Sequence, residues 1–264
     1  MSDLHVTVLG CGASAGVPMI GCDCAVCSSA DPRNRRSRVS LLIEQYGKRL
    51  LIDVSPDFRQ QCLNHHVSRL DAILFTHAHA DHCHGIDDLR PINHHMGMAI
   101  PAYGDPAAMD EILQRFGYAF KEPIAEYGWF RPALIPHILD VDNLKPFQVG
   151  DMQVQYFPQV HGKTMTLGVR VGNVAYSTDV NHFPEAAFEY LHNLDLWIVD
   201  CLRYSPSPTH AHLEMTLQWI AQFKPKRAIL THMSHDFDYE SFARDLPEGV
   251  EPAYDGLSLT IKTS

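Results

Sequence analysis

The sequence lacks the features that would place the protein in a membrane or in a secretory pathway. None of its apolar runs approaches the roughly 18 residues that a membrane-spanning helix needs. The first residues, Met1 to His5, contain no basic segment followed by an apolar stretch, so no signal peptide is visible. The seven cysteines are an odd number, which argues against a framework of disulfides. We therefore expect a cytoplasmic protein that does not associate with membranes.

Positive charge is also scarce in this chain. Lysine and arginine number 21 against 31 aspartates and glutamates, which gives a formal net charge of −10. A field of that sign repels nucleic acid, so such a partner would require a local basic patch. The segment from Arg33 to Arg38 is the nearest candidate, because four of its residues are arginines. This segment is either a cluster that holds a phosphate or a solvated loop, and we do not expect a nucleic-acid partner.

Neither an internal repeat nor a linker interrupts the 264 residues, which suffice for one large domain with a sizeable core. Apolar strand-like segments alternate with segments of helical pattern, and this order predicts an α/β fold in which helices cover sheets. The exception is the stretch from Tyr118 to Val149, which is irregular and contains four prolines. Long segments of this kind are often lids or dimer contacts. We expect a single domain over residues 1–264.

A glycine-rich loop, Gly10 to Pro18, follows the first predicted strand. Three glycines in seven residues allow the backbone to turn sharply or to approach a ligand closely. The spacing is neither that of a P-loop nor that of a dinucleotide-binding loop, so the loop alone assigns no function.

The most informative stretch runs from Thr76 to His82 and carries four potential metal ligands directly after an apolar strand. The two-residue spacing of His77 and His79 places both side chains on one face of an extended segment. Asp81 and His82 then lie in the turn that follows and reach a second point nearby. This arrangement suits two metal ions better than one.

The H-x-H-x-D-H order of these residues resembles the signature of the metallo-β-lactamase superfamily. The resemblance implies a four-layer αβ/βα sandwich. Three further residues stand where predicted strands end and match the remaining ligands of the binuclear members, namely His161, Asp179 and His232. The resemblance also implies that one metal is held by His77, His79 and His161. The second is held by Asp81, His82 and His232, with Asp179 bridging the two.

Two divalent metals, zinc or manganese, would supply what phosphodiester hydrolysis requires. A hydroxide that bridges them exists near neutral pH, and the second ion stabilises charge on the substrate. The leaving oxygen also needs a proton, for which the loop histidines His210 and His212 are the candidates. The register against phosphodiesterase members of the superfamily favours His210. We predict catalytic roles for Asp81, His210 and His212.

A separate metal site, built from cysteines, is also indicated by the sequence. The C-x-C-x-x-C spacing of Cys22, Cys24 and Cys27 provides three thiolates. Free buried cysteines are the alternative. His235, three residues after His232, is the expected fourth ligand of one structural zinc. This combination resembles the PhnP-type phosphodiesterases, which act on phosphoribosyl cyclic phosphates. A zinc-binding loop is therefore predicted over residues 22–27.

The resemblance implies a binuclear metal-dependent phosphodiesterase that acts on a small cyclic ribose phosphate or nucleotide-like substrate, as a possible homodimer. One alternative is a tRNA 3′-processing type of endoribonuclease, which the acidic charge disfavours. A thioester or lactam hydrolase is another, for which the cysteine cluster is unsuited. A third is a non-hydrolytic PqqB-like protein, whose metal centre is degraded, whereas all the ligand positions are intact here.

Overall fold

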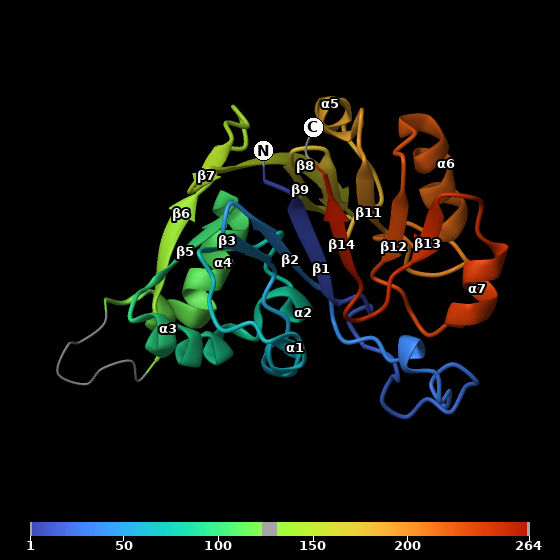
Figure 1. Cartoon of the computed structure of the whole chain (residues 1–264), viewed down its shortest axis with the longest axis horizontal. Coiled ribbons are helices and arrows are strands. Elements are labelled where there is room, and N and C mark those ends of the chain that lie inside the picture. The colour runs from blue at the N-terminus through green and yellow to red at the C-terminus, as the bar shows by residue number, and fades with distance from the viewer. Residues whose placement is uncertain (1, 123–130, 263–264) are drawn as a thin grey trace.

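A computed structural model describes residues 2–122 and 131–262. Within these ranges the strands form two seven-stranded sheets (Figure 1). The first sheet has the order β14 (Ser258–Ile261), β1 (Leu4–Gly10), β2 (Ser40–Gln45), β3 (Lys48–Ile52), β4 (Ala72–Leu74), β5 (Ile100–Gly104) and β6 (Leu134–Ile138). The second sheet has the order β13 (Val250–Pro252), β12 (Ala228–Thr231), β11 (Leu196–Asp200), β10 (Val174–Ser177), β9 (Thr164–Val171), β8 (Met152–His161) and β7 (Phe147–Val149).

Helices cover the outer faces of both sheets, which gives the predicted four layers. The α-helices are α1 (Phe58–His65), α2 (Ala80–Cys83), α3 (Arg90–Met96), α4 (Pro106–Phe116), α5 (Phe188–Leu191), α6 (Leu213–Phe223) and α7 (Tyr239–Asp245). Short 3₁₀ turns are η1 (Pro32–Asn34), η2 (Ile86–Leu89), η3 (Gly117–Phe120) and η5 (Glu185–Ala187). None of the described helices is long and apolar enough to cross a membrane.

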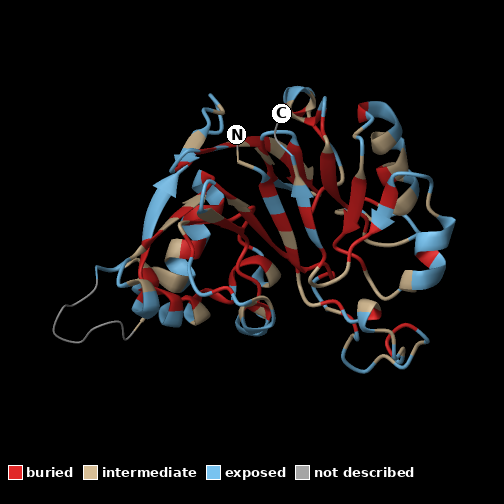
Figure 2. Cartoon of the chain, in the orientation of Figure 1, coloured by how far each residue is buried: buried red, intermediate tan, exposed pale blue. Residues whose placement is uncertain are grey.

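The alternation of side chains along the first sheet explains why it is buried on both faces. Leu50 and Ile52 of β3 join the core between the two sheets, whereas Leu51 joins a second core under the helices. Successive residues of a strand point to opposite faces, so an uninterrupted apolar run is needed when both faces are covered. Figure 2 shows the resulting contrast between the buried strands and the exposed outer sides of the helices.

The segment from Tyr118 to Val149 contains two strands, β6 and β7, so the expectation of one long irregular stretch is wrong. Four of the five β6 residues are exposed, because this strand lies at the edge of its sheet. Its sequence therefore lacks the apolar alternation that predicts a strand. The aromatic residues Tyr127, Trp129 and Phe130, which contributed to the lid or dimer expectation, lie outside the described residues.

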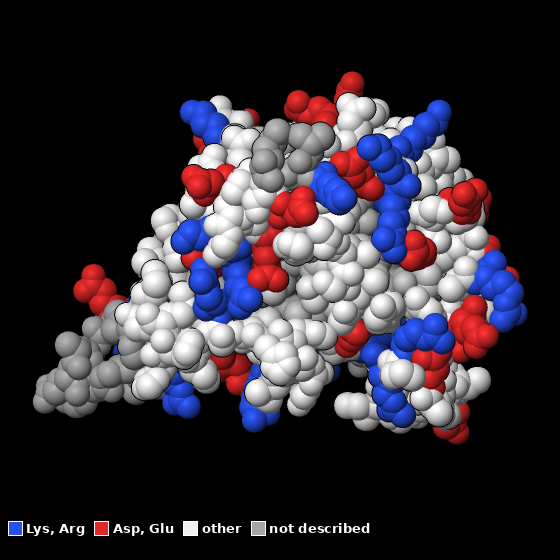
Figure 3. All heavy atoms as spheres, in the orientation of Figure 1, with Lys and Arg blue, Asp and Glu red and all other residues white. Residues whose placement is uncertain are grey.

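Several strands end at the edge of the sandwich where the predicted ligands gather. Three residues just beyond the ends of β3, β10 and β12 have left-handed backbone conformations: Asp53 (φ 63°), Asp179 (φ 51°) and His232 (φ 56°). Such conformations cost free energy in residues other than glycine and persist where the surroundings enforce them. In these positions Asp179 and His232 face one another at 3.4 Å, and Asp53 contacts His82. On the face that Figure 3 shows, acidic and basic side chains are interspersed.

Candidate metal centre

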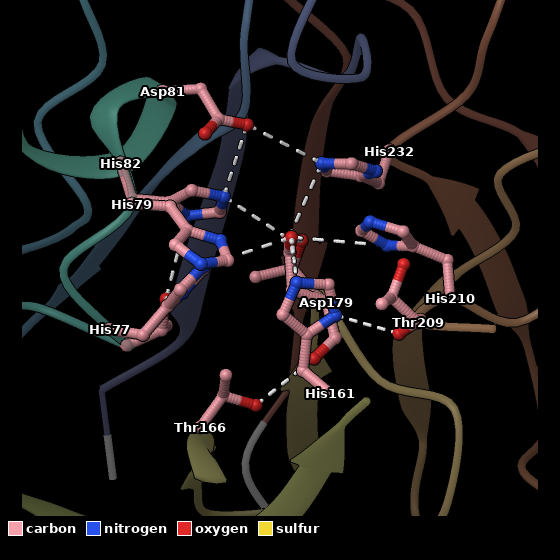
Figure 4. Close-up of polar contacts among 12 residues, drawn as sticks. His77, His79, Asp81, His82, His161, Thr166, Asp179, Thr209, His210 and His232 are labelled. Atoms are coloured by element: carbon pink, nitrogen blue, oxygen red, sulfur yellow. Dashed lines mark hydrogen bonds and ion pairs between the residues drawn. The ribbon is translucent and has the colours of Figure 1, made fainter. Parts of the chain in front are cut away.

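Four of the predicted ligands lie between the end of β4 and the first turn of α2 (Figure 4). His77 lies three residues after β4, His79 directly precedes α2, and Asp81 and His82 lie within that helix. His77 and His82 are buried, whereas His79 is exposed to solvent. The strand-to-helix transition expected from the sequence therefore presents these side chains to one pocket.

The three remaining ligands arrive from the second sheet. His161 is the last residue of β8, Asp179 follows β10 by two residues, and His232 comes directly after β12. All three are buried. The structure thus brings together, from distant parts of the chain, every residue that the sequence predicted for the binuclear site.

The two carboxylate oxygens of Asp179 face different sets of histidines. Its Oδ2 atom lies 3.8 Å from Nε2 of His77 and 3.8 Å from Nε2 of His161. Its Oδ1 atom lies 3.1 Å from Nε2 of His82 and 3.4 Å from Nε2 of His232. The donor atoms form two groups within each of which all distances are below 4.8 Å, namely His77, His79, His161 and Asp179, and Asp81, His82 and His232.

Several buried nitrogen atoms in this pocket have no hydrogen-bond partner among the described residues. They are the Nε2 atoms of His77 and His82 and both ring nitrogens of His232. Buried polar atoms are almost always hydrogen-bonded, and an unpaired imidazole nitrogen that faces carboxylates fits a divalent cation. The donor set of imidazoles and carboxylates is one that zinc and manganese accept. The residues therefore fit a pair of divalent metals.

The charges around the pocket lead to the same conclusion. Burial disfavours a charged imidazole, yet the carboxylate of Asp179 outweighs it and raises the pKa of His232 to about 9. The pKa of His82 also lies well above its usual value, because Asp179 and Asp53 outweigh burial there. By contrast, burial lowers the pKa of His77. The pocket thus retains protons where a metal cation would supply positive charge, and metal binding would release them.

Contacts behind the ligands fix the orientation of their rings. Nδ1 of His82 lies 2.6 Å from Oδ2 of Asp53, and the Thr76 hydroxyl donates to the same oxygen. Nδ1 of His161 donates to the carbonyl of Thr209 over 2.6 Å. Each bond leaves Nε2 as the ring atom that faces the pocket. Partners of this kind set the tautomer of a metal-binding histidine.

The two candidate acids occupy different positions. His210 lies in the pocket, where its ring stacks on that of His232 at a centroid distance of 4.6 Å. Its Nδ1 atom is 3.0 Å from Oδ2 of Asp200, a buried residue at the end of β11. His212 instead precedes α6, where its backbone carbonyl accepts a hydrogen bond from Thr216. The geometry favours His210, and Asp200 is a partner that sequence reasoning did not assign.

The cysteine cluster is assembled as the sequence predicted. The Sγ atoms of Cys22 and Cys24 lie 3.6 and 3.3 Å from Nδ1 of His235. Cys27 completes a group whose donor atoms all lie within 4.8 Å of one another. The backbone amide of Cys27 and the ring of His235 lower the pKa of Cys24 to about 6, which favours a thiolate ligand. Three sulfurs and one imidazole fit a tetrahedral zinc.

A short segment beyond β12 connects the two sites, because His232 and His235 are three residues apart. Between them, Met233 forms backbone hydrogen bonds with the glycine-rich loop: its amide donates to the Cys11 carbonyl, and its carbonyl accepts from Ala13. The guanidinium of the buried Arg36 donates to the carbonyl of Ser234. The glycine-rich loop, whose role the sequence left open, thus supports the segment that carries a ligand of each site.

Comparison with known proteins identifies the family. The model of the β-lactamase superfamily domain matches residues 48–233, which is most of the chain. The chain belongs to the metallo-β-lactamase superfamily. The fold and the two groups of donor residues are consistent with this membership.

Among the superfamily structures similar to this chain is a diphosphatase from the PhnP family. It superposes with a TM-score of 0.91 and 38% identity, over 99% of this chain and 98% of that one. Zinc-bound PqqB from Methylobacterium extorquens superposes with a TM-score of 0.76 and 20% identity, over 97% and 99% of the two chains. At that identity the likeness shows the shared fold.

A protein of Porphyromonas gingivalis named octanoyltransferase is 37% identical over 261 residues. The match covers 98% of this chain and 52% of that protein, so the superfamily domain described here spans about half of this relative's length.

Proposed function

We propose that this protein hydrolyses a small phosphodiester or diphosphate at a centre of two divalent metals. The observation that carries the proposal is the position of Asp179, whose two oxygens face two separate groups of histidines. A bridging carboxylate between two ligand sets is the arrangement that a binuclear centre requires. When bound, zinc or manganese would provide an activated water and would neutralise the charge of the phosphoryl oxygens.

The ligand sets follow from the two groups of donor atoms. His77, His79 and His161 would hold one ion. Asp81, His82 and His232 would hold the other, with Asp179 between them. We retain a catalytic role for Asp81, whose side chain is only partly buried and therefore accessible from the pocket.

His210 is the proposed general acid. Its Nδ1 atom is engaged by Asp200, which leaves Nε2 to hold the proton that the leaving oxygen needs. His212, the other candidate, is the weaker one because it stands at the start of α6. Asp200 accepts a further hydrogen bond from the backbone of Val180, so its carboxylate is fixed in place. We infer that it holds the His210 ring in the correct orientation.

One structural zinc is proposed at Cys22, Cys24, Cys27 and His235. The zinc would hold the loop of residues 22–27 against the segment beyond β12. The loop needs such support because it has little apolar core of its own. Small loops of this kind gain their folding free energy from the metal.

The substrate class rests on two observations. The similar PhnP-family structure is a diphosphatase, and this favours a phosphorus–oxygen bond in a small molecule. The formal net charge of −10 disfavours a tRNA substrate, because binding to its phosphate backbone relies on basic residues. A homodimer and a cytoplasmic location stay predictions from the sequence.

A substrate panel tests the proposal. Purified protein with zinc or manganese would be assayed on bis(p-nitrophenyl) phosphate, cyclic nucleotides, ribose cyclic phosphates, a nucleoside diphosphate sugar and a tRNA precursor. We expect turnover of at least one small substrate. The Asp179→Ala variant should lose this turnover and should also lose the two catalytic metals. Turnover of the tRNA precursor alone would instead favour the endoribonuclease, and no turnover of any substrate would favour a PqqB-like protein.

A further inference from the structure

The arginines between Arg33 and Arg38 have separate structural roles. Arg33 forms an ion pair with Asp31 at 2.8 Å, and its guanidinium lies over the ring of Tyr239. Arg36 is buried and donates to backbone carbonyls of the segment beyond β12. These two side chains therefore help to hold the loop in place.

Arg35 and Arg38, together with the buried Arg36, line a cavity of about 470 Å³. Arg35 is exposed and forms no ion pair within the described ranges 2–122 and 131–262. The Nε atom of Arg38 lies 2.9 Å from Oδ2 of Asp57, so one edge of its guanidinium is engaged. A cavity of this size is within the range of small-molecule sites.

Further walls of the cavity come from the glycine-rich loop, from one face of α1 and from two aspartates, Asp57 and Asp255. Gly16 has a φ of +66°, and a Cβ atom there would lie 3.7 Å from Cδ of Arg38. Gln60 and Asn64 contribute amide groups from α1, and the fully exposed Ile20 adds an apolar rim. The cavity thus lies between the glycine-rich loop and the arginine segment, neither of which has a chemical role in the proposed hydrolysis.

The cavity is distinct from the metal centre but lies on the same side of the sandwich. None of its lining residues is a ligand of either candidate metal site. The glycine-rich loop follows β1 and α1 follows β3, and both strands run toward the edge where the catalytic histidines gather. In Figure 3, basic and acidic side chains lie together at the lower right, the region of the N-terminal loop in Figure 1.

We propose that this cavity binds the phosphate monoester group of a small molecule, with Arg35 and Arg38 as its cationic partners. Guanidinium groups bind phosphate through pairs of parallel hydrogen bonds, which suits a site with one free and one partly engaged arginine. In a protein with a net charge of −10, this cavity is locally basic, because its three arginines outnumber its two aspartates. The amides of α1 would contact the hydroxyl groups of the ligand.

The test uses the metal-loaded protein, with glucose 6-phosphate as the probe and glucose as the uncharged control. Binding to the wild type is measured by isothermal titration calorimetry and compared with binding to Arg35→Gln. We expect the dissociation constant to rise at least about tenfold, because one charge-assisted contact to phosphate is lost. Arg59→Gln is the matched control, because Arg59 is an exposed arginine of α1 that does not line the cavity.

Glucose 6-phosphate that binds wild type and Arg35→Gln equally would overturn the proposal, since the phosphate would then be held elsewhere, as at the catalytic histidines. Absence of binding to the wild type would overturn it as well. The calorimetric measurement does not depend on turnover of any substrate. The binding result therefore stands whether or not the proposed hydrolysis is found.

Two sources of the phosphate group are then separable. If the group belongs to the substrate, glucose 6-phosphate should inhibit turnover of bis(p-nitrophenyl) phosphate less strongly in Arg35→Gln than in the wild type. If it belongs to a separate ligand, inhibition should be equal in both proteins while binding still differs. Either result supports the proposed site.

Discussion

His82 and Asp53 form a fully buried pair in which Nδ1 of the imidazole lies 2.6 Å from Oδ2 of the carboxylate. The other oxygen of Asp53 accepts the backbone amide of Thr76. The Asp53 carboxylate is thus held by Thr76, the first residue of the metal-binding stretch. These contacts indicate that Asp53 orients the His82 ring.

We expect Asp53→Asn to weaken metal binding by roughly 10-fold to 100-fold, because the amide cannot hold His82 as a carboxylate does. The affinity for the catalytic metals would be measured by competition with a chelator. Asp71→Asn is a suitable control, since Asp71 forms ion pairs with Lys48 and Arg69 away from the pocket. Unchanged metal affinity in Asp53→Asn would show that the backbone alone orients the imidazole.

His210→Ala should lower kcat by roughly 10²-fold to 10⁴-fold if His210 protonates the leaving group. Its pH–rate profile should also lose the limb that reports this acid, whereas the content of catalytic metals stays the same. His212→Ala should retain most of the activity, because His212 stands at the start of α6. The opposite ranking of the two variants would transfer the role of acid to His212.

Cys24→Ser should remove one metal from a total of about three per chain, as measured by elemental analysis. The melting temperature should fall by about 10 °C or more, since the loop depends on its metal for folding. Cys62→Ser provides the comparison, because Cys62 lies in α1 and outside the cluster. A melting temperature as high as that of Cys62→Ser would mean that the cysteines are simple thiols.

Gly12→Ala should disturb the catalytic centre from a distance. A Cβ atom at Gly12 would lie 2.6 Å from the carbonyl oxygen of Arg36, so the glycine-rich loop must shift and take Met233 with it. We expect weaker binding of the metal at His232, measured by chelator competition. In Gly117→Ala, where nothing lies within 4 Å of the added atom, metal affinity should be unchanged. Equal metal affinities in the two variants would argue that the glycine-rich loop does not support the segment that carries His232.

The sequence by itself determined the chemistry of the centre. The order from His77 to His82 depends on local spacing, and the later ligands stand at the ends of apolar strands whose pattern is readable. The four layers followed from the family resemblance and are confirmed. Local sequence patterns could not predict β6. An exposed edge strand buries too little apolar surface to require alternation of apolar and polar residues.

Only the tertiary structure decided how these residues face one another. The direction of each Asp179 oxygen, the pairing of His210 with Asp200, and the division of the arginines between structural contacts and the cavity depend on long-range packing. Such contacts join segments that are far apart in the chain, and no periodicity within either segment encodes the angle at which they meet. Side-chain type is a property of the sequence, but the direction of a side chain depends on the sheets that support it.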